Sequence, residues 1–406
     1  MQNRLPIFFI LITVTLDSMG IGLILPVMPD LIREIQGANL ASAALWGGIL
    51  AASFAVMQFL FGPALGNLSD RFGRRPVLLT ALFVMTLDYL ILATASTIGW
   101  LLAGRIVGGI TAATQSTASA YIADTSKPEE KSTNFGLIGA AFGIGLVFGP
   151  LIGGLLAGLG TRAPFYATAV LAFANLVFGY FILPETVTDK IRRRFEWRRE
   201  NPLGAFRHIG ALPDVRPLMV ITFLYGIAFF VYPAVWAYFG QARFGWGPGM
   251  IGLSLAIFGT SMAIVQGILI RPILRVIGER KTVLLGLSID VFAFLFLGFV
   301  ENGMLALIVT PFAALGSIAG PATQGIMSRR ASDDQQGELQ GALTSINAIA
   351  MIIAPVLMTR IFWFFNQPAA PYNFPGAPFL FSMALTVICI VVFVIFRPAP
   401  ARVNTL

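Results

Sequence analysis

The sequence has almost none of the residues that form disulfides, metal sites or histidine-based catalytic centres. Its 406 residues include one cysteine, Cys389, and one histidine, His208. A lone cysteine excludes a disulfide framework within the chain and a metal site made of cysteines. A lone histidine excludes a cluster of histidines around a metal ion or a nucleophile. We therefore expect no resident metal, no cofactor and no catalytic residues.

Charged residues are scarce as well. Asp, Glu, Lys and Arg supply 11% of the chain, against about 25% in a soluble domain. Hydrophobic residues supply 57%, and the mean hydropathy is +0.82. Apolar runs of about 20 residues, long enough to cross a bilayer, recur along the sequence. The pattern predicts an all-α membrane protein with twelve helices at 7–27, 44–65, 76–95, 98–121, 134–157, 163–183, 217–239, 249–270, 281–299, 303–327, 338–361 and 377–396.

The basic residues are unevenly distributed over this helix map. Most of the 27 Lys and Arg fall on the side that also holds both termini, whereas the other side holds Arg33, Arg162, Arg243 and Arg360. Such an excess marks the cytoplasmic side of a membrane protein. We therefore expect both termini in the cytoplasm, and we attribute the net charge of +8 to topology instead of nucleic-acid binding.

One polar segment, residues 184–216, interrupts the apolar pattern with a run of basic residues. It divides the chain into two six-helix halves, an N-terminal bundle at 1–183 and a C-terminal bundle with a short tail at 217–406. We interpret the segment as a solvated cytoplasmic linker beside anionic lipid headgroups, with a regulatory docking segment as the alternative.

The two halves resemble each other. The stretch "GRRPVLL" (Gly73–Leu79) opens one predicted helix of the first half, and "ERKTVLL" (Glu279–Leu285) opens one of the second. Duplicated halves are typical of transporters, in which two bundles move around a site at their interface. Neither a receptor nor a membrane-embedded enzyme has need of such a repeat.

Four ionisable residues lie inside the apolar runs: Asp17, Asp88, Asp290 and Arg105. An ionisable side chain at mid-membrane costs about 2.5–3.5 kcal/mol, so a functional role is the default interpretation. A rise of about 1.5 Å per residue puts Asp88 and Arg105 at matching depth on consecutive helices, with Asp17 within reach. Our hypothesis is that Arg105 keeps Asp17 or Asp88 ionised, while the acids without a partner, Asp290 above all, take up and release protons. The alternatives are a buried ion pair that fixes helix packing and, for Asp290, a hydrogen-bonded neutral acid.

A short charged turn, "GNLSDRFGRR" (Gly66–Arg75), connects the second and third predicted helices. Its glycines permit tight bends. We expect Asp70 to meet the positive N-terminal end of a neighbouring helix, and Arg71 and Arg74 to pair with acids such as Asp124. Contacts of this kind would hold two bundles together on one side and break when the protein opens; a positively charged loop without further role is the alternative. The candidate gating residues here are Gly66, Asp70, Arg71, Gly73, Arg74 and Asp124.

The fifth predicted helix combines glycines four residues apart with a proline. Gly149 and its neighbours put small residues on nearby faces, so another helix can approach closely. Pro150 removes one backbone hydrogen bond and permits a bend. We therefore assign Gly149 and Pro150 to gating, with a static, tightly packed helix pair as the alternative.

Intramembrane amides and aromatic rings are the candidate substrate-binding groups. The amides can hydrogen-bond a polar ligand or, equally well, a neighbouring helix. The rings of the seventh predicted helix suit a wide, mostly apolar pocket. The candidates are Gln58, Gln115, Gln266, Gln324, Phe229 and Trp236.

Several motifs resemble those of a known family. "GNLSDRFGRR" is similar to the signature loop of the major facilitator superfamily, and "GRIVGGITAA" (Gly104–Ala113) to its second motif, whose key arginine corresponds to Arg105. "GAAFGIGLVFGPLIGG" (Gly139–Gly154) resembles the motif of its drug/proton antiporters. "PATQGIMS", "QGELQG" and "RFGW" resemble the bacterial tetracycline/proton antiporters. The resemblance covers nearly the whole chain apart from the central segment and the C-terminal tail.

This resemblance implies a twelve-helix, two-bundle antiporter of a bacterial inner membrane that works as a monomer. It would export an amphipathic drug, such as a tetracycline carried as a divalent-metal chelate, in exchange for an entering proton. One departure is Met262, which stands where the best-known members carry a histidine. A facilitator or importer of an endogenous metabolite is the first alternative, and a membrane-embedded enzyme or sensory scaffold is the second.

Overall fold

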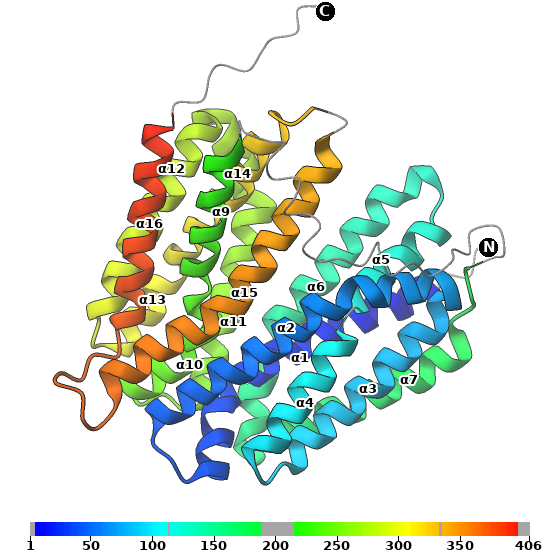
Figure 1. Cartoon of the computed structure of the whole chain (residues 1–406), viewed down its shortest axis with the longest axis horizontal. Helices are drawn as coiled ribbons and strands as arrows, with labels where there is room; N and C mark the ends of the chain where they lie inside the picture. Colours follow the sequence, from blue (N-terminus) through cyan, green and yellow to red (C-terminus); the bar gives the residue numbers. More distant parts are fainter. Residues whose placement is uncertain (1–4, 113, 188–214, 333–334, 397–406) are drawn as a thin grey trace, which may run out of the picture. The chain divides into compact units, whose positions relative to one another are not determined.

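The computed structural model describes residues 5–112, 114–187, 215–332 and 335–396, without the side chains of residues 115, 128 and 132. These residues form helices and no strands (Figure 1). Two compact units are present: unit 1 comprises Met1–Pro202 and Trp246–Ala256, and unit 2 comprises Leu203–Gly245 and Ile257–Leu406. Most of the predicted linker at 184–216 lies outside the described residues, and the predicted domain boundaries remain a prediction.

Long helices make up the first part of the chain. They are α1 (Leu5–Gln36), α2 (Leu40–Phe72), α3 (Arg74–Thr94), α4 (Ile98–Thr111), α5 (Thr114–Thr125), α6 (Pro128–Leu156) with the 3₁₀ turn Ala157–Leu159, and α7 (Ala163–Ile182).

The second part continues the same pattern with more frequent interruptions. Its elements are α9 (Arg216–Phe229), α10 (Val231–Phe244), α11 (Pro248–Ile264), the π-helical turn η5 (Val265–Leu269), α12 (Ile270–Phe299), α13 (Gly303–Ala313), the 3₁₀ turn η6 (Ala314–Ile318), α14 (Ala319–Ser328), α15 (Gln336–Asn366) and α16 (Ala377–Ile395).

Some of the helices begin at a capping side chain. Asn39 accepts a hydrogen bond from the backbone N–H of Ser42 at 2.9 Å at the start of α2, and Asn302 caps α13 in the same way through Met304 at 2.9 Å. A short polar side chain at this position satisfies backbone donors that have no partner within the helix. The predicted apolar runs lie in helices, but α1 and α2 extend well beyond the predicted ends at residues 27 and 65.

Ten helical segments of the described structure are long and apolar enough to span a membrane, whereas the sequence predicted twelve spans. The predicted span 98–121 is divided into α4 and α5. The predicted spans 249–270 and 281–299 follow one another as an almost continuous helix from Pro248 to Phe299. The predicted end at residue 270 is therefore wrong, because the chain stays helical as far as Gly278.

Gly278 marks the break within α12, with φ 73° and ψ 165°. Gly73, between α2 and α3, likewise has a positive φ of 112°. Glycine adopts such angles because it lacks a Cβ atom. Gly73 is the first residue of one repeated stretch and Gly278 immediately precedes the other, so the two backbone turns lie within one residue of each other in the repeat.

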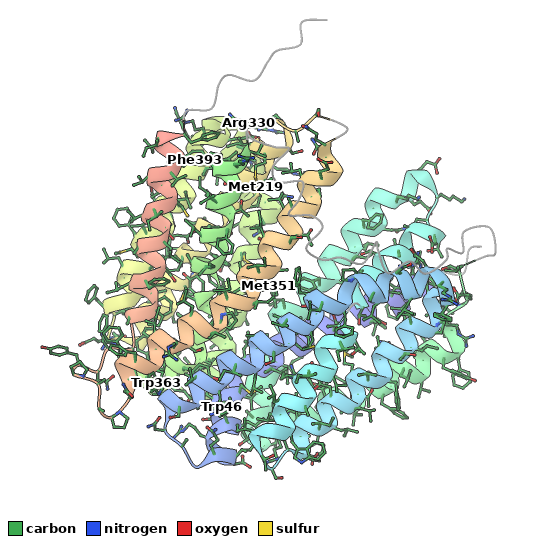
Figure 2. All side chains as sticks on the ribbon, in the orientation of Figure 1. Trp46, Met219, Arg330, Met351, Trp363 and Phe393 are labelled. Atoms are coloured by element: carbon green, nitrogen blue, oxygen red, sulfur yellow. The ribbon has the colours of Figure 1, made fainter. Side chains whose placement is uncertain are left out.

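Each unit has its own apolar core. In unit 1 the core joins α1, α3, α5 and α6, and includes Phe9, Leu78 and Tyr121. In unit 2 it joins α9, α12, α14, α15 and α16, and includes Met219 and Phe393, both labelled in Figure 2. Large apolar side chains also point outward; Phe181 is 76% exposed and Phe292 is 70% exposed. Such exposure is what a lipid-facing surface requires.

Candidate functional site

The Asp88 carboxylate lies within unit 1, on α3, opposite α4. Its Oδ2 atom is 2.5 Å from Nη2 of Arg105, and the two residues are 4% and 7% exposed. The glycines at 104 and 108 permit this contact, since a Cβ atom at Gly104 would lie 2.9 Å from Asp88 Oδ1. The predicted matching depth of Asp88 and Arg105 is confirmed; their role in proton coupling stays a prediction.

Asp17 has a different setting. It lies on α1, is partly buried, and makes no ion pair within the described part of the chain. The next turn of α1 packs closely on α3, because a Cβ atom at Gly20 would overlap the Tyr89 hydroxyl. Of the two carboxylates predicted to compete for Arg105, the structure pairs Asp88 with it.

Asp290 is the carboxylate of unit 2. It lies on α12, is fully buried, and accepts a hydrogen bond at Oδ2 from the Tyr225 hydroxyl of α9 at 2.8 Å. As expected, no basic residue pairs with Asp290 among the described residues; its partner is a neutral hydroxyl. Sequence spacing did not predict this contact, because Tyr225 lies on a helix far from α12 along the chain.

The turn between α2 and α3 forms a network centred on Arg74. Arg74 lies 2.5 Å from Asp70 and 3.1 Å from Asp124, so its predicted pairing with Asp124 is confirmed. Asp70 pairs with Arg74 and not with a neighbouring helix end. The Arg71 guanidinium lies 5.0 Å from the ring of Phe72, and no acid pairs with it among the described residues.

The acid at the N-terminus of α3 is Glu185, which lies in the predicted linker at 184–216. Its carboxylate accepts from the backbone N–H groups of Arg74 and Arg75, at 2.9 and 3.1 Å. A negative charge is favourable there because the helix dipole is positive at its N-terminus. Gly73 is required beside it, since a Cβ atom would overlap this carboxylate. At Gly66, by contrast, a Cβ atom would have no neighbouring atom within 4 Å.

The glycines of α6 differ in what surrounds them. Cβ atoms at Gly145, Gly149 and Gly153 would overlap α1, whereas those at Gly139 and Gly143 would meet nothing within 4 Å. Close packing of helices through glycines four apart is thus present between α1 and α6. Pro150 contributes to the same interface, since it faces Gly22 of α1. Whether Gly149 and Pro150 act as a gate stays a prediction.

The predicted substrate amides do not share one environment. Gln58 donates to the Ala112 carbonyl at 3.1 Å and so joins α2 to the end of α4. Gln266 is exposed within the π-helical turn, and Gln324 is exposed with Gln340 at 3.4 Å. The Gln115 side chain lies outside the described residues.

Phe229 and Trp236 belong to a cluster of aromatic rings in unit 2. Tyr232 stands at its centre, with ring centroids 5.5 Å from Phe229 and 6.0 Å from Trp236. Phe258 and Phe379 extend the cluster. Trp236 is 3% exposed, so in this conformation it packs in the core of the unit.

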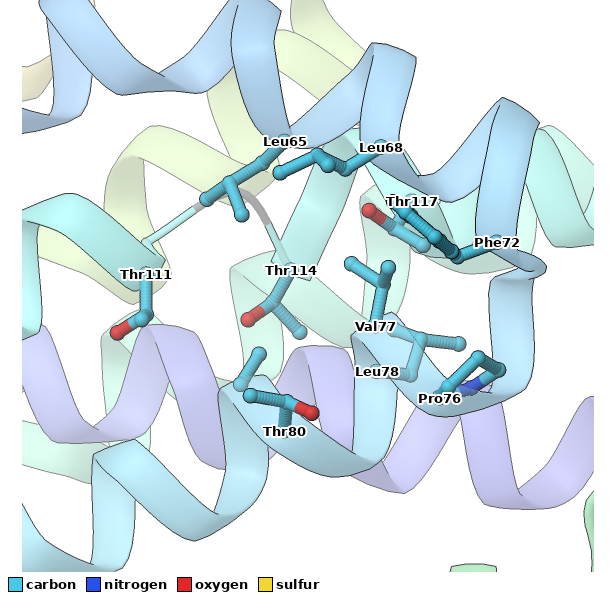
Figure 3. A pocket seen from close by; sticks show the side chains of 11 residues that line it. Leu65, Leu68, Phe72, Pro76, Val77, Leu78, Thr80, Thr111, Thr114 and Thr117 are labelled. Carbon is cyan, nitrogen blue, oxygen red and sulfur yellow. The ribbon is translucent and has the colours of Figure 1, made fainter. Parts of the chain in front are cut away.

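A hollow of about 250 Å³ lies among α2, α3, α4 and α5 (Figure 3). Its walls are apolar, with threonine hydroxyls at Thr80, Thr111, Thr114 and Thr117. Thr117 is 1% exposed, and its hydroxyl has no partner among the described residues. None of the predicted substrate residues lines this hollow. No group of three His, Cys, Asp or Glu suited to a metal ion occurs in the described part of the chain.

Comparisons with known proteins match nearly the whole chain. The family model of the Major Facilitator Superfamily matches residues 10–355 and 218–406. The chain is 41% identical to the class C tetracycline resistance protein of Escherichia coli, over 96% of each chain. It is 39% identical to the class B protein of Escherichia coli, over 87% of each. The crystal structure of the human organic anion transporter MFSD10 has a TM-score of 0.67 and 25% identity, over 97% of this chain and 100% of that one.

Proposed function

Because this chain belongs to the major facilitator superfamily, we propose that it exports a tetracycline, as a chelate with a divalent metal ion, in exchange for an entering proton. The observation that carries the proposal is its 41% identity, across nearly the full length, to a tetracycline resistance protein. It is a multi-pass membrane protein with a small-molecule substrate. We place both termini in the cytoplasm, and we propose that it acts as a monomer without catalysing a chemical reaction.

Asp290 is the proposed proton carrier. It is fully buried in unit 2, and among the described residues its hydrogen-bond donor is a neutral hydroxyl. A carboxyl group without a cationic partner can exist in both protonation states, because burial penalises its charge. A proton crossing a potential of 100 mV releases about 2.3 kcal/mol, which adds to any pH gradient.

Asp88 and Arg105 have the complementary role in the proposal. Their separation of 2.5 Å joins opposite charges inside the bundle. The guanidinium and the carboxylate balance each other's charge, so we assign the pair to helix positioning during transport. Met262 cannot titrate, so coupling would proceed without a group at that position.

Uptake of tetracycline with Mg²⁺ into inverted membrane vesicles tests the proposal. Uptake should require an imposed pH gradient and stop when an ionophore collapses it. Vesicles with Asp290→Asn serve as the matched control. Uptake that survives both the ionophore and the substitution would contradict the proposal.

A second candidate function is a facilitator or importer of an endogenous metabolite on the same fold. Tolerance of a pump-deficient host separates the two, because an exporter raises the inhibitory concentration of tetracycline and an importer does not.

A further inference from the structure

The Tyr225 hydroxyl has two acceptors within unit 2. It lies 2.8 Å from Asp290 Oδ2 and 3.3 Å from the carbonyl oxygen of Gly316. Gly316 belongs to the 3₁₀ turn η6, where the span between α13 and α14 departs from α-helix. A hydroxyl has one proton to donate, so it serves one of the two acceptors at a time.

Among the described residues, no permanent charge competes with this hydroxyl for Asp290. The elements packed against α12 are η5, α13, η6, α14 and α16, and Cys389 of α16 is the one titratable residue in their sequences. Its thiol lies 3.7 Å from the carbonyl oxygen of Ile221. On α12 itself the nearest charged residue is Lys281, more than two helical turns away. The preceding helices α9 and α10 contribute Tyr225 and Tyr232 to the vicinity, and carry Arg216 and Arg243 at their far ends.

Packing holds the three groups together. Asp290 is fully buried, and a Cβ atom at Gly316 would overlap its carboxylate. The Tyr225 ring is held against Phe229, with centroids 5.9 Å apart. The second carboxylate oxygen, Oδ1, is buried without a partner among the described residues and is the free position for a proton.

We propose that Tyr225 is a positioning residue that stabilises the deprotonated Asp290 carboxylate and, when Asp290 gains a proton, turns its hydroxyl to the Gly316 carbonyl. The entering proton binds Oδ1, Tyr225 keeps its own proton, and no other bond changes. A change in the protonation state of Asp290, on α12, thereby changes the hydrogen bonding of the Gly316 carbonyl in η6. This inference rests on the proposed function, since it takes Asp290 as the proton carrier.

Tyr232 supplies a matched control. It is 4% exposed, its ring lies 5.7 Å from that of Phe294 on α12, and its hydroxyl has no partner among the described residues. Tyr225→Phe and Tyr232→Phe each remove one buried hydroxyl and keep the ring. A role confined to packing predicts equal effects of the two substitutions.

The test uses the full chain reconstituted in liposomes and dicyclohexylcarbodiimide, which reacts with protonated carboxyl groups. Mass spectrometry of the peptide that contains Asp290 gives the extent of modification at each pH. Tyr225→Phe should move the half-maximal pH upward by about one unit, because loss of a hydrogen bond to the carboxylate favours the protonated form. Tyr232→Phe should leave it unchanged. Coincident curves for both variants and the unmodified protein would overturn the proposal.

Tetracycline uptake by the same preparations separates this inference from the proposed function. If the unmodified protein exchanges tetracycline for protons and the two variants have the same pH profile, the positioning role alone fails. If the unmodified protein carries no tetracycline, the proposed function fails, and the modification curves still decide the role of Tyr225. Identical elution of all three proteins in size-exclusion chromatography verifies their folding.

Discussion

The buried carboxylates of the two units have similar packing and different partners. Asp88 in unit 1 and Asp290 in unit 2 each face glycines, which leave room for the carboxylate. Asp88 is paired with the guanidinium of Arg105, whereas Asp290 receives a hydrogen bond from a neutral phenol. A buried ion pair is stable only while both charges remain. A carboxyl group with a neutral partner can change its charge, so the difference supports the proposal that the Asp88 site is structural and the Asp290 site exchanges protons.

Removal of Arg105 should have the largest effect on this comparison. Arg105→Leu would leave Asp88 buried without its cation, which costs about 3–5 kcal/mol of stability. The thermal unfolding midpoint in detergent should fall sharply. The double variant Asp88→Leu with Arg105→Leu should recover most of the loss, because no unpaired charge remains. Equal midpoints for the single and double variants would contradict this account, because the unpaired Asp88 carboxylate would then not be the source of the loss.

Asp290→Asn should give the opposite combination of effects. The amide keeps an oxygen that can accept from Tyr225 but cannot exchange a proton at neutral pH. Proton-driven tetracycline uptake should fall to background, while stability changes by about 1 kcal/mol or less. Vesicle uptake and thermal unfolding measure the two quantities. A large loss of stability would instead indicate that Asp290, like Asp88, has a structural role.

Gly316→Ala should disturb the Asp290 site more than a similar change nearby. The added methyl group would overlap the carboxylate, and overpacking of this kind costs about 1–3 kcal/mol. Gly320→Ala on α14 is the control, because its nearest neighbouring atom lies 4.0 Å away. Equal unfolding midpoints for the two variants would contradict the close contact between α12 and η6.

The smallest effects concern the amides of the two units. Gln58→Leu removes the hydrogen bond from α2 to Ala112 and should cost about 0.6 kcal/mol. Gln266 is exposed, so Gln266→Leu should leave stability unchanged and raise the KM for tetracycline if the amide binds substrate. Thermal unfolding and concentration-dependent uptake distinguish these roles. A stability loss at Gln266 with an unchanged KM would identify it as a helix contact.

The pairing of Asp88 with Arg105 was within reach of the sequence, because depth along a helix follows from counting residues. The hydrogen bond from Tyr225 to Asp290 was not, because depth does not tell which face of a helix a neighbour covers. Glu185 was missed for a related reason: it follows α7 in the chain, yet it caps α3. The glycines of α6 were recognised as a packing motif, but only their neighbours reveal that Gly149 meets α1 while Gly139 does not.

The amino-acid sequence alone determined that the chain crosses a membrane many times and that its halves are related. Transfer of apolar side chains into lipid is a sum over local residues, so each span can be recognised without its neighbours. The tertiary structure determined that Asp88 pairs with a guanidinium and that Asp290 accepts a hydrogen bond from a hydroxyl. Those partners depend on the rotation of each helix about its axis, which close packing against other helices fixes.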